Sequence, residues 1–292
     1  EGGNSYKEYT TDMQETGRSG TFACEPLDEG TLMVGNMLYF AVIHREAEKD
    51  GWQLLKIDAT DWTTLLDKFY ALDSPMDNPM DPMLTFVNGQ LDISSQYNLS
   101  GKPPDPDTPT GDYGTHHNFF SLDLEPLGKI ILTEPPHVNG SYMVYVEGIY
   151  YLVTSDTFDG DVLVAKYDQD WKYVGGKTLI KQAHFSTGLV YDNQRFYLAY
   201  TDTSQRFGPT IPPVSLNIRL AVFDREWNLL DNVAVTSYTP QDGRQPGRPW
   251  VLLHGNRLYV SYDLDLVDPA THEEKAQWQA NVSVYELIQA AP

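Results

Sequence analysis

The sequence predicts an all-β protein, a five-bladed β-propeller of four-stranded antiparallel blades. Three observations predict it: a hairpin unit that recurs five times, a further pair of strands after each hairpin, and a shared turn between the third and fourth strands. Repeated four-strand units are the sequence signature of propeller blades. The length of 292 residues suits one all-β domain, and the repeats use nearly all of it.

Each hairpin consists of a short apolar run, a two-residue turn, and a second run rich in Tyr, Leu and Val. The turns are Gly35-Asn36, Asn88-Gly89, Glu147-Gly148, Asp192-Asn193 and Gly255-Asn256. Asn, Asp and Gly accept the positive φ that tight hairpin turns need. The β-branched and aromatic residues beside the turns suit a pleated, half-buried surface.

The third strands of the five units all end in an acidic residue. They read WQLLKID, NFFSLD, VLVAKYD, IRLAVFD and VSVYE, and in four units a large apolar residue follows at Trp62, Leu127, Trp171 or Trp227. We expect these residues to occupy equivalent turn positions, with the three indoles packed between adjacent blades.

The blades span approximately residues 22–72, 77–133, 137–181, 182–237 and 245–288. The fifth unit lacks a fourth strand, and an unpaired sheet edge promotes aggregation. We therefore expect residues 5–11 to pair with residues 280–288 and to close the ring as the outer strand of the last blade. A loose N-terminal tail is the alternative.

Composition excludes several classes of function. The net charge of −21 argues against binding to nucleic acid or to anionic membranes. No apolar run of transmembrane length occurs. Cys24 is the only cysteine, so no disulfide forms within the chain. The chain begins at Glu1 without Met, which fits either a mature secreted protein or a trimmed chain, and we expect a secreted or periplasmic location.

Long connections and histidines gather at one predicted end of the blades. The long loops run from Ser95 to His117, from Asp202 to Leu216 and from Leu264 to Trp278. Long loops on a rigid scaffold commonly carry function. The candidate ligand-binding residues at this end are His44, His117, His184 and Arg248.

A ring of polar residues precedes the first strands of the blades, ten positions before each hairpin turn. The ring comprises Glu25, Asn78, His137, Gln182 and Gln245. One carboxylate with amide oxygens suits calcium better than zinc, so a divalent cation on the propeller axis is one prediction. A polar channel filled with water is the alternative.

Two stretches carry a family resemblance. MDPMLTFVNGQLDIS resembles the Asp-Pro strand–turn–strand signature of five-bladed glycoside hydrolases of families 43 and 32, and SYMVYVEGIYYLVTSD resembles their Tyr-rich hairpins. The resemblance implies that Asp28 and Asp81 are catalytic carboxylates, a base and a second, tuning aspartate. The family's third acid, a Glu in blade three, has no counterpart, because that position holds Gly140 and Ser141.

The leading hypothesis is a carbohydrate-active, glycoside-hydrolase-like propeller with an acidic pocket at the mouth of the central channel. Two alternatives remain open: a non-catalytic propeller that binds a ligand or a cation, and a metal-dependent hydrolase of esters. The expected partner is a carbohydrate or another small molecule. Propeller architecture alone does not choose between these functions.

Overall fold

The computed structural model describes residues 4–22, 29–46, 49–77, 79, 82–99, 113–134, 141–155, 161–206, 215–268 and 274–287. The chain divides into two compact units. The first comprises Glu1–Tyr97 and His116–Ile130, and the second comprises Asn98–Thr115 and Ile131–Pro292. Asp28 and Asp81, the predicted catalytic residues, lie outside the described residues, as do Glu25, Asn78 and His137.

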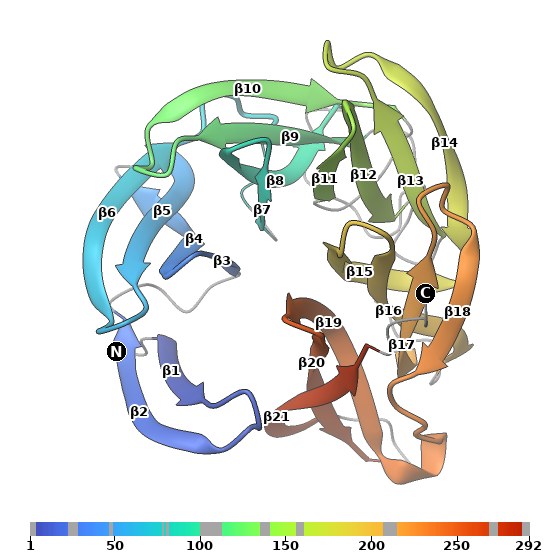
Figure 1. Cartoon of the computed structure of the whole chain (residues 1–292). Coiled ribbons are helices and arrows are strands. Elements are labelled where there is room, and N and C mark those ends of the chain that lie inside the picture. Colours follow the sequence, from blue (N-terminus) through green and yellow to red (C-terminus); the bar gives the residue numbers. More distant parts are fainter. Residues whose placement is uncertain are drawn as a thin grey trace. The chain divides into compact units, whose positions relative to one another are not determined.

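The first unit contains an N-terminal hairpin, the first blade and most of the second. Figure 1 labels the strands. The hairpin consists of β1 (Asn4–Tyr9) and β2 (Glu15–Phe22). Blade one runs in the order β3 (Glu29–Val34), β4 (Met37–Glu46), β5 (Lys49–Asp58) and β6 (Thr63–Ala71). Blade two runs β7 (Met83–Val87), β8 (Gln90–Asn98), β9 (Tyr113–Phe120) and β10 (Pro126–Leu132).

The second unit contains the other three blades. Blade three runs β11 (Tyr142–Val146), β12 (Ile149–Ser155), β13 (Val162–Tyr167) and β14 (Tyr173–Ile180). Blade four runs β15 (Ala183–Tyr191), β16 (Phe196–Arg206), β17 (Ser215–Phe223) and β18 (Leu229–Ala234). A 3₁₀ turn, η1 (Pro240–Asp242), leads into blade five, which runs β19 (Arg244–His254), β20 (Arg257–Val267) and β21 (Glu274–Glu286).

These sheets confirm the predicted fold class, an all-β five-bladed propeller with antiparallel blades. Four blades have four strands, and the fifth has three among the described residues. The segment expected to act as the closing strand forms a hairpin with β2, with Ser5 opposite Thr21 and Tyr9 opposite Glu15. The sequence analysis missed β2 because ETGRSGTF has few apolar residues. Pairing of residues 5–11 with residues 280–288 stays a prediction.

The hairpin turns have the backbone that the sequence predicts. Gly35, Asn88, Glu147, Asn193 and Gly255 all have positive φ, at 61°, 49°, 51°, 74° and 61°. Each lies at a turn between the first and second strand of its blade. The five repeated turns therefore fix the register of the five hairpins.

First strands of neighbouring blades approach closely at two glycines. In the first unit, a Cβ added to Gly30 of β3 would clash with the carbonyl oxygen of Pro82 and lie 2.5 Å from Leu84 Cδ1 of β7. In the second unit, a Cβ added to Gly188 of β15 would lie 2.5 Å from the backbone nitrogen of Val251 in β19. Only glycine allows backbones to approach this closely.

Apolar side chains fill the space between neighbouring sheets in each unit. In the first unit the core cluster comprises Tyr39, Ala41, Trp52, Leu54, Leu84, Leu91, Ile93, Phe120 and Leu124. In the second unit one cluster joins blades four and five and comprises Tyr197, Ala199, Ile218, Leu220, Val251, Leu258, Val260 and Tyr262. The described residues include no helix that could cross a membrane.

The turn between third and fourth strands repeats as predicted in three blades. Trp62, Trp171 and Trp227 have φ values of 64°, 61° and 63°. The backbone N–H of each donates to the carbonyl of the acid that ends the third strand. In blade two this position belongs to Leu124, with φ 59°, whereas the expected residue Leu127 is exposed. The prediction for Leu127 was wrong because the turn starts at Ser121 rather than at Asp123.

The three indoles differ in what they contact. Trp227 is 1% exposed, stacks on Phe196 at 3.9 Å between ring centroids, and also contacts Tyr151 of blade three at 5.6 Å. Packing between adjacent blades is therefore confirmed for Trp227. Trp171 is half-buried and stacks on Tyr150 of its own blade, and Trp62 packs on the apolar residues of blade one.

Replacing Trp227 by Ala should lower the free energy of unfolding by about 3–5 kcal/mol, the usual loss for a buried large aromatic. The matched variant Trp171→Ala removes the same side chain from a half-buried position and should cost less. Urea unfolding of both variants measures the difference. Equal losses in the two variants would contradict the assigned role of Trp227 between blades.

Candidate functional site

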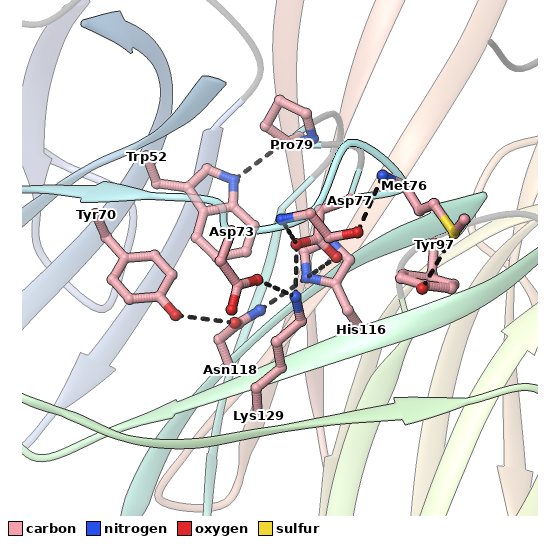
Figure 2. Close-up of polar contacts among 11 residues, drawn as sticks. Trp52, Tyr70, Asp73, Met76, Asp77, Pro79, Tyr97, His116, Asn118 and Lys129 are labelled. Atoms are coloured by element: carbon pink, nitrogen blue, oxygen red, sulfur yellow. Dashed lines mark hydrogen bonds and ion pairs between the residues drawn. The ribbon is translucent and has the colours of Figure 1, made fainter. Parts of the chain in front are cut away.

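A buried polar network lies in the first unit, around the segment that connects β6 to β7 (Figure 2). Lys129 of β10 bridges two carboxylates, with its Nζ 2.7 Å from Asp73 Oδ1 and 2.5 Å from Asp77 Oδ2. The Asp77 side chain is fully buried, and burial raises its pKa while the Lys129 ammonium opposes that shift. A buried carboxylate with a paired cation holds the connecting segment in one conformation.

Aromatic and amide groups complete the network. The His116 ring lies parallel to Trp52, 5.5 Å between centroids, and its Nδ1 lies 2.8 Å from Asn118 Nδ2 and 3.9 Å from Asp77 Oδ1. Trp52 Nε1 donates to the carbonyl of Pro79 at 3.0 Å. Figure 2 shows these groups converging on the connecting segment from β5, β9 and β10. Two separate contacts, at Asp77 and Pro79, therefore anchor the chain just before Asp81.

A second buried pair lies on blade two. His117 Nδ1 is 2.9 Å from Asp92 Oδ2, and both side chains are fully buried. The hydroxyl of Thr85 also donates to Asp92, at 3.3 Å. The sequence analysis missed Asp92, because the pairing joins β8 to β9 and has no local sequence signal.

The structure corrects the position of His117. The sequence analysis placed His116 and His117 at the end of a long loop, whereas both lie within β9 and are fully buried. The loops are shorter than expected because the strands continue past polar residues. β8 extends to Asn98, β16 extends to Arg206, and β20 extends to Val267.

The other candidate histidines lie on strands. His44, in β4, is half-buried and contacts the Phe69 ring edge-on at 5.6 Å between centroids. The backbone of His184 pairs with Thr201 in blade four. Ligand binding by these residues stays a prediction.

Among the described residues, two members of the predicted cation ring lie in the second unit. Gln182 is exposed in a bend with φ 55°, and its backbone N–H donates to Asp161 Oδ1 at 3.2 Å. Gln245 is half-buried in β19, directly opposite Asp265 of β20. Within the part of the chain that the structure describes, no cluster of three His, Cys, Asp or Glu side chains suits a metal ion. The calcium site stays a prediction.

Arg248 lies in an irregular part of β19 with a carboxylate close by. Its side chain is exposed and its φ is 47°, within a register shift between Gly247 and Trp250. Asp263 lies opposite Gly247 and is half-buried. Burial raises the pKa of Asp263, and the positive charge of Arg248 opposes this shift. The sequence analysis identified Arg248 but missed Asp263, which lies within the strand pattern of YVSYDLDLV.

No protein-family model matches this sequence, and no curated protein matches it. Solved structures do match the fold. An α-L-arabinofuranosidase from Lactobacillus brevis superposes with a TM-score of 0.53 at 11% identity, covering 87% of this chain and 90% of that chain. A thermostable family-43 glycoside hydrolase gives 0.53 at 13% identity, covering 88% and 90%. A Bacillus subtilis arabinanase gives 0.50 at 14%, covering 88% and 94%.

A different class of protein matches equally well. A subtype N11 neuraminidase-like protein has a TM-score of 0.52 at 9% identity, covering 91% of this chain and 74% of that chain. These likenesses show that the chain has a glycoside-hydrolase-like propeller fold, as the resemblance to family 43 implies. At this identity they show the fold alone.

Replacing Lys129 by Met should lower the free energy of unfolding by about 3 kcal/mol, because the Asp77 carboxylate would stay buried without its cation. The matched control is Lys68→Met, which removes a lysine paired with the exposed Glu125 and should cost at most about 1 kcal/mol. Chemical denaturation of both variants at neutral pH measures this. A loss for Lys129→Met no larger than that of the control would contradict the assigned role of the buried pair.

Proposed function

We propose that this protein is carbohydrate-active and binds a saccharide in an acidic pocket where β3 and β7 begin, with Asp28 and Asp81 as its carboxylates. The observation that carries the proposal is the close approach of Gly30 to Pro82 in the first unit. Gly30 lies two residues after Asp28, and Pro82 lies directly after Asp81. Gly30 and Pro82, which follow the two aspartates closely in the sequence, are therefore adjacent.

The described residues on either side of Asp81 in the sequence make several contacts. Before it, Asp77 is paired with Lys129 and the Pro79 carbonyl accepts from Trp52. After it, Pro82 is buried against β3. Functional side chains need this support from their neighbours, because small displacements weaken binding.

The fold supports a saccharide as the ligand. The solved structures with the same fold include an arabinofuranosidase, an arabinanase and a family-43 glycoside hydrolase. Carboxylates are acceptors, so they pair with the hydroxyl donors of a sugar. Gly140 and Ser141 occupy the blade-three position where the resembling family has its third catalytic acid. We therefore propose saccharide binding, and the experiment below measures hydrolysis as well.

Asp28→Asn and Asp81→Asn should each weaken saccharide binding by about tenfold or more, because a hydrogen bond to a charged acceptor contributes about 1.5–3 kcal/mol. Isothermal titration with arabinotriose, xylotriose and cellotriose measures affinity, and a reducing-sugar assay on the same samples measures hydrolysis. Asp67→Asn is the control, since this exposed carboxylate accepts a hydrogen bond from the Gln53 side chain in blade one. If the wild-type protein binds none of these sugars, or both variants bind as it does, the proposed function is wrong.

Gly30→Ala should weaken saccharide binding and lower the free energy of unfolding by about 1–3 kcal/mol, because the added methyl group would push β3 away from Pro82. Gly128→Ala is the matched control, because a Cβ at that position in β10 meets nothing within 4 Å. Thermal unfolding and titration with the same sugars measure both effects. If Gly30→Ala binds the sugars with unchanged affinity, the contact between Gly30 and Pro82 does not support the proposed pocket.

A further inference from the structure

One face of blade five carries polar and aromatic side chains while the other face is core. The register of β19 and β20 places Trp250 opposite Ser261, Gly247 opposite Asp263, and Gln245 opposite Asp265. Directly opposed residues of an antiparallel pair project to the same face. The other face carries Val251, Leu258, Val260 and Tyr262, which pack in the core with blade four.

A β-bulge presents Arg248 at this site. Between Gly247 and Trp250 two residues, Arg248 and Pro249, oppose the single residue Tyr262 of β20. Arg248 has a φ of 47°, which is unfavourable for a residue other than glycine. Bulges of this kind redirect side chains and recur beside binding sites. The strained backbone leaves the Arg248 side chain exposed.

Polar atoms of this site are available to a ligand. The exposed Arg248 guanidinium and the half-buried Asp263 carboxylate make no hydrogen bond or ion pair with each other, nor with other residues of the described structure, although their charges interact. A Cβ added to Gly247 would meet nothing within 4 Å, so the space beside Asp263 is open. A half-buried carboxyl beside an unoccupied donor is typical of a binding site.

An aromatic ring lies next to these two charged groups. Trp250 is half-buried, and Tyr142 of β11 contacts it edge-on, with 5.8 Å between ring centroids and 83° between ring planes. This contact orients the indole before a ligand binds. A large, rigid ring loses little conformational entropy when a ligand packs against it.

We propose that Arg248, Trp250 and Asp263 form a subsite for an uncharged saccharide. This subsite rests on the proposed function and specifies the class of saccharide that binds. Asp263 would accept hydrogen bonds from sugar hydroxyls, and Arg248 would donate to hydroxyl or ring oxygens. The indole of Trp250 would pack against the apolar C–H face of the sugar. The subsite is described entirely within the second unit.

The charges favour a neutral sugar over an acidic one. Arg248 alone would attract a uronate, but the neighbouring Asp263 carboxylate offsets its charge. The whole chain carries a net charge of −21, which repels anions at a distance. An anionic ligand would therefore meet repulsion both during approach and in the subsite.

Titration of the full chain with neutral and acidic trisaccharides tests the subsite. The neutral probes are arabinotriose, xylotriose and cellotriose, and the acidic probe is trigalacturonate. Asp263→Asn, Arg248→Met and Trp250→Ala should each weaken binding of the neutral sugar by about tenfold or more. Arg244→Met is the control, because Arg244 is an exposed arginine of the same strand that lies over the Tyr238 ring. Asp263→Asn preserves size and shape, and thermal unfolding checks that each variant folds.

The outcomes separate this subsite from the pocket at β3 and β7. If the three substitutions leave neutral-sugar binding unchanged while Asp81→Asn weakens it, the subsite is wrong and the proposed function stands. Loss of affinity in these three variants but not in Asp28→Asn or Asp81→Asn would support the subsite and overturn the pocket. Tighter binding of trigalacturonate than of any neutral probe, or binding of no probe at all, would overturn the subsite.

Discussion

The close approach of first strands from neighbouring blades is the constraint on which the rest of each unit depends. Gly30 of β3 meets Pro82 in the first unit, and Gly188 of β15 meets Val251 in the second. A side chain at either glycine would separate the two strands and open the apolar clusters between the sheets. In the first unit this approach joins Gly30, two residues after Asp28, to Pro82, directly after Asp81. Packing of the core in both units thus depends on these two glycines.

Much of the fold could be predicted from the sequence because its signals are local. Hairpin turns such as Asn88-Gly89 need positive φ, and the residues that accept it stand in the sequence at each turn. The turn tryptophans repeat for the same reason. The strand ends and the N-terminal hairpin could not be predicted, because hydrogen bonding to a neighbouring strand extends β8, β16 and β20 through polar residues and stabilises the polar strand β2.

The candidate sites were only half predictable, since they depend on pairs that are distant in the sequence. Arg248 occupies the blade-five position equivalent to Asp28 and Asp81, so the sequence repeat predicted it as a candidate site residue. Asp263 and Asp92 occupy second strands, where an acid alternating with apolar residues reads as a solvent-facing position. The positive charge of Arg248 near Asp263, and the contact of His117 with Asp92, become apparent only once the strands are in register. His117 was misplaced for the same reason, because GTHHNFF carries no apolar alternation that would predict a buried strand.

The fold does not determine which reaction or ligand this protein has, so the chemistry must be argued from individual residues. A neuraminidase-like protein and an arabinofuranosidase match this chain with TM-scores of 0.52 and 0.53, so the propeller alone does not select a reaction. Acid–base hydrolysis of a glycoside ordinarily needs one carboxyl that is held protonated and a second that is ionised. The blade-three position that the family resemblance assigns to the protonated acid holds Gly140 and Ser141, whereas Asp263 in blade five is a half-buried carboxyl whose pKa burial raises. The positive charge of Arg248 opposes the raised pKa of Asp263, so in the proposed subsite this carboxyl would accept hydrogen bonds from sugar hydroxyls rather than transfer a proton.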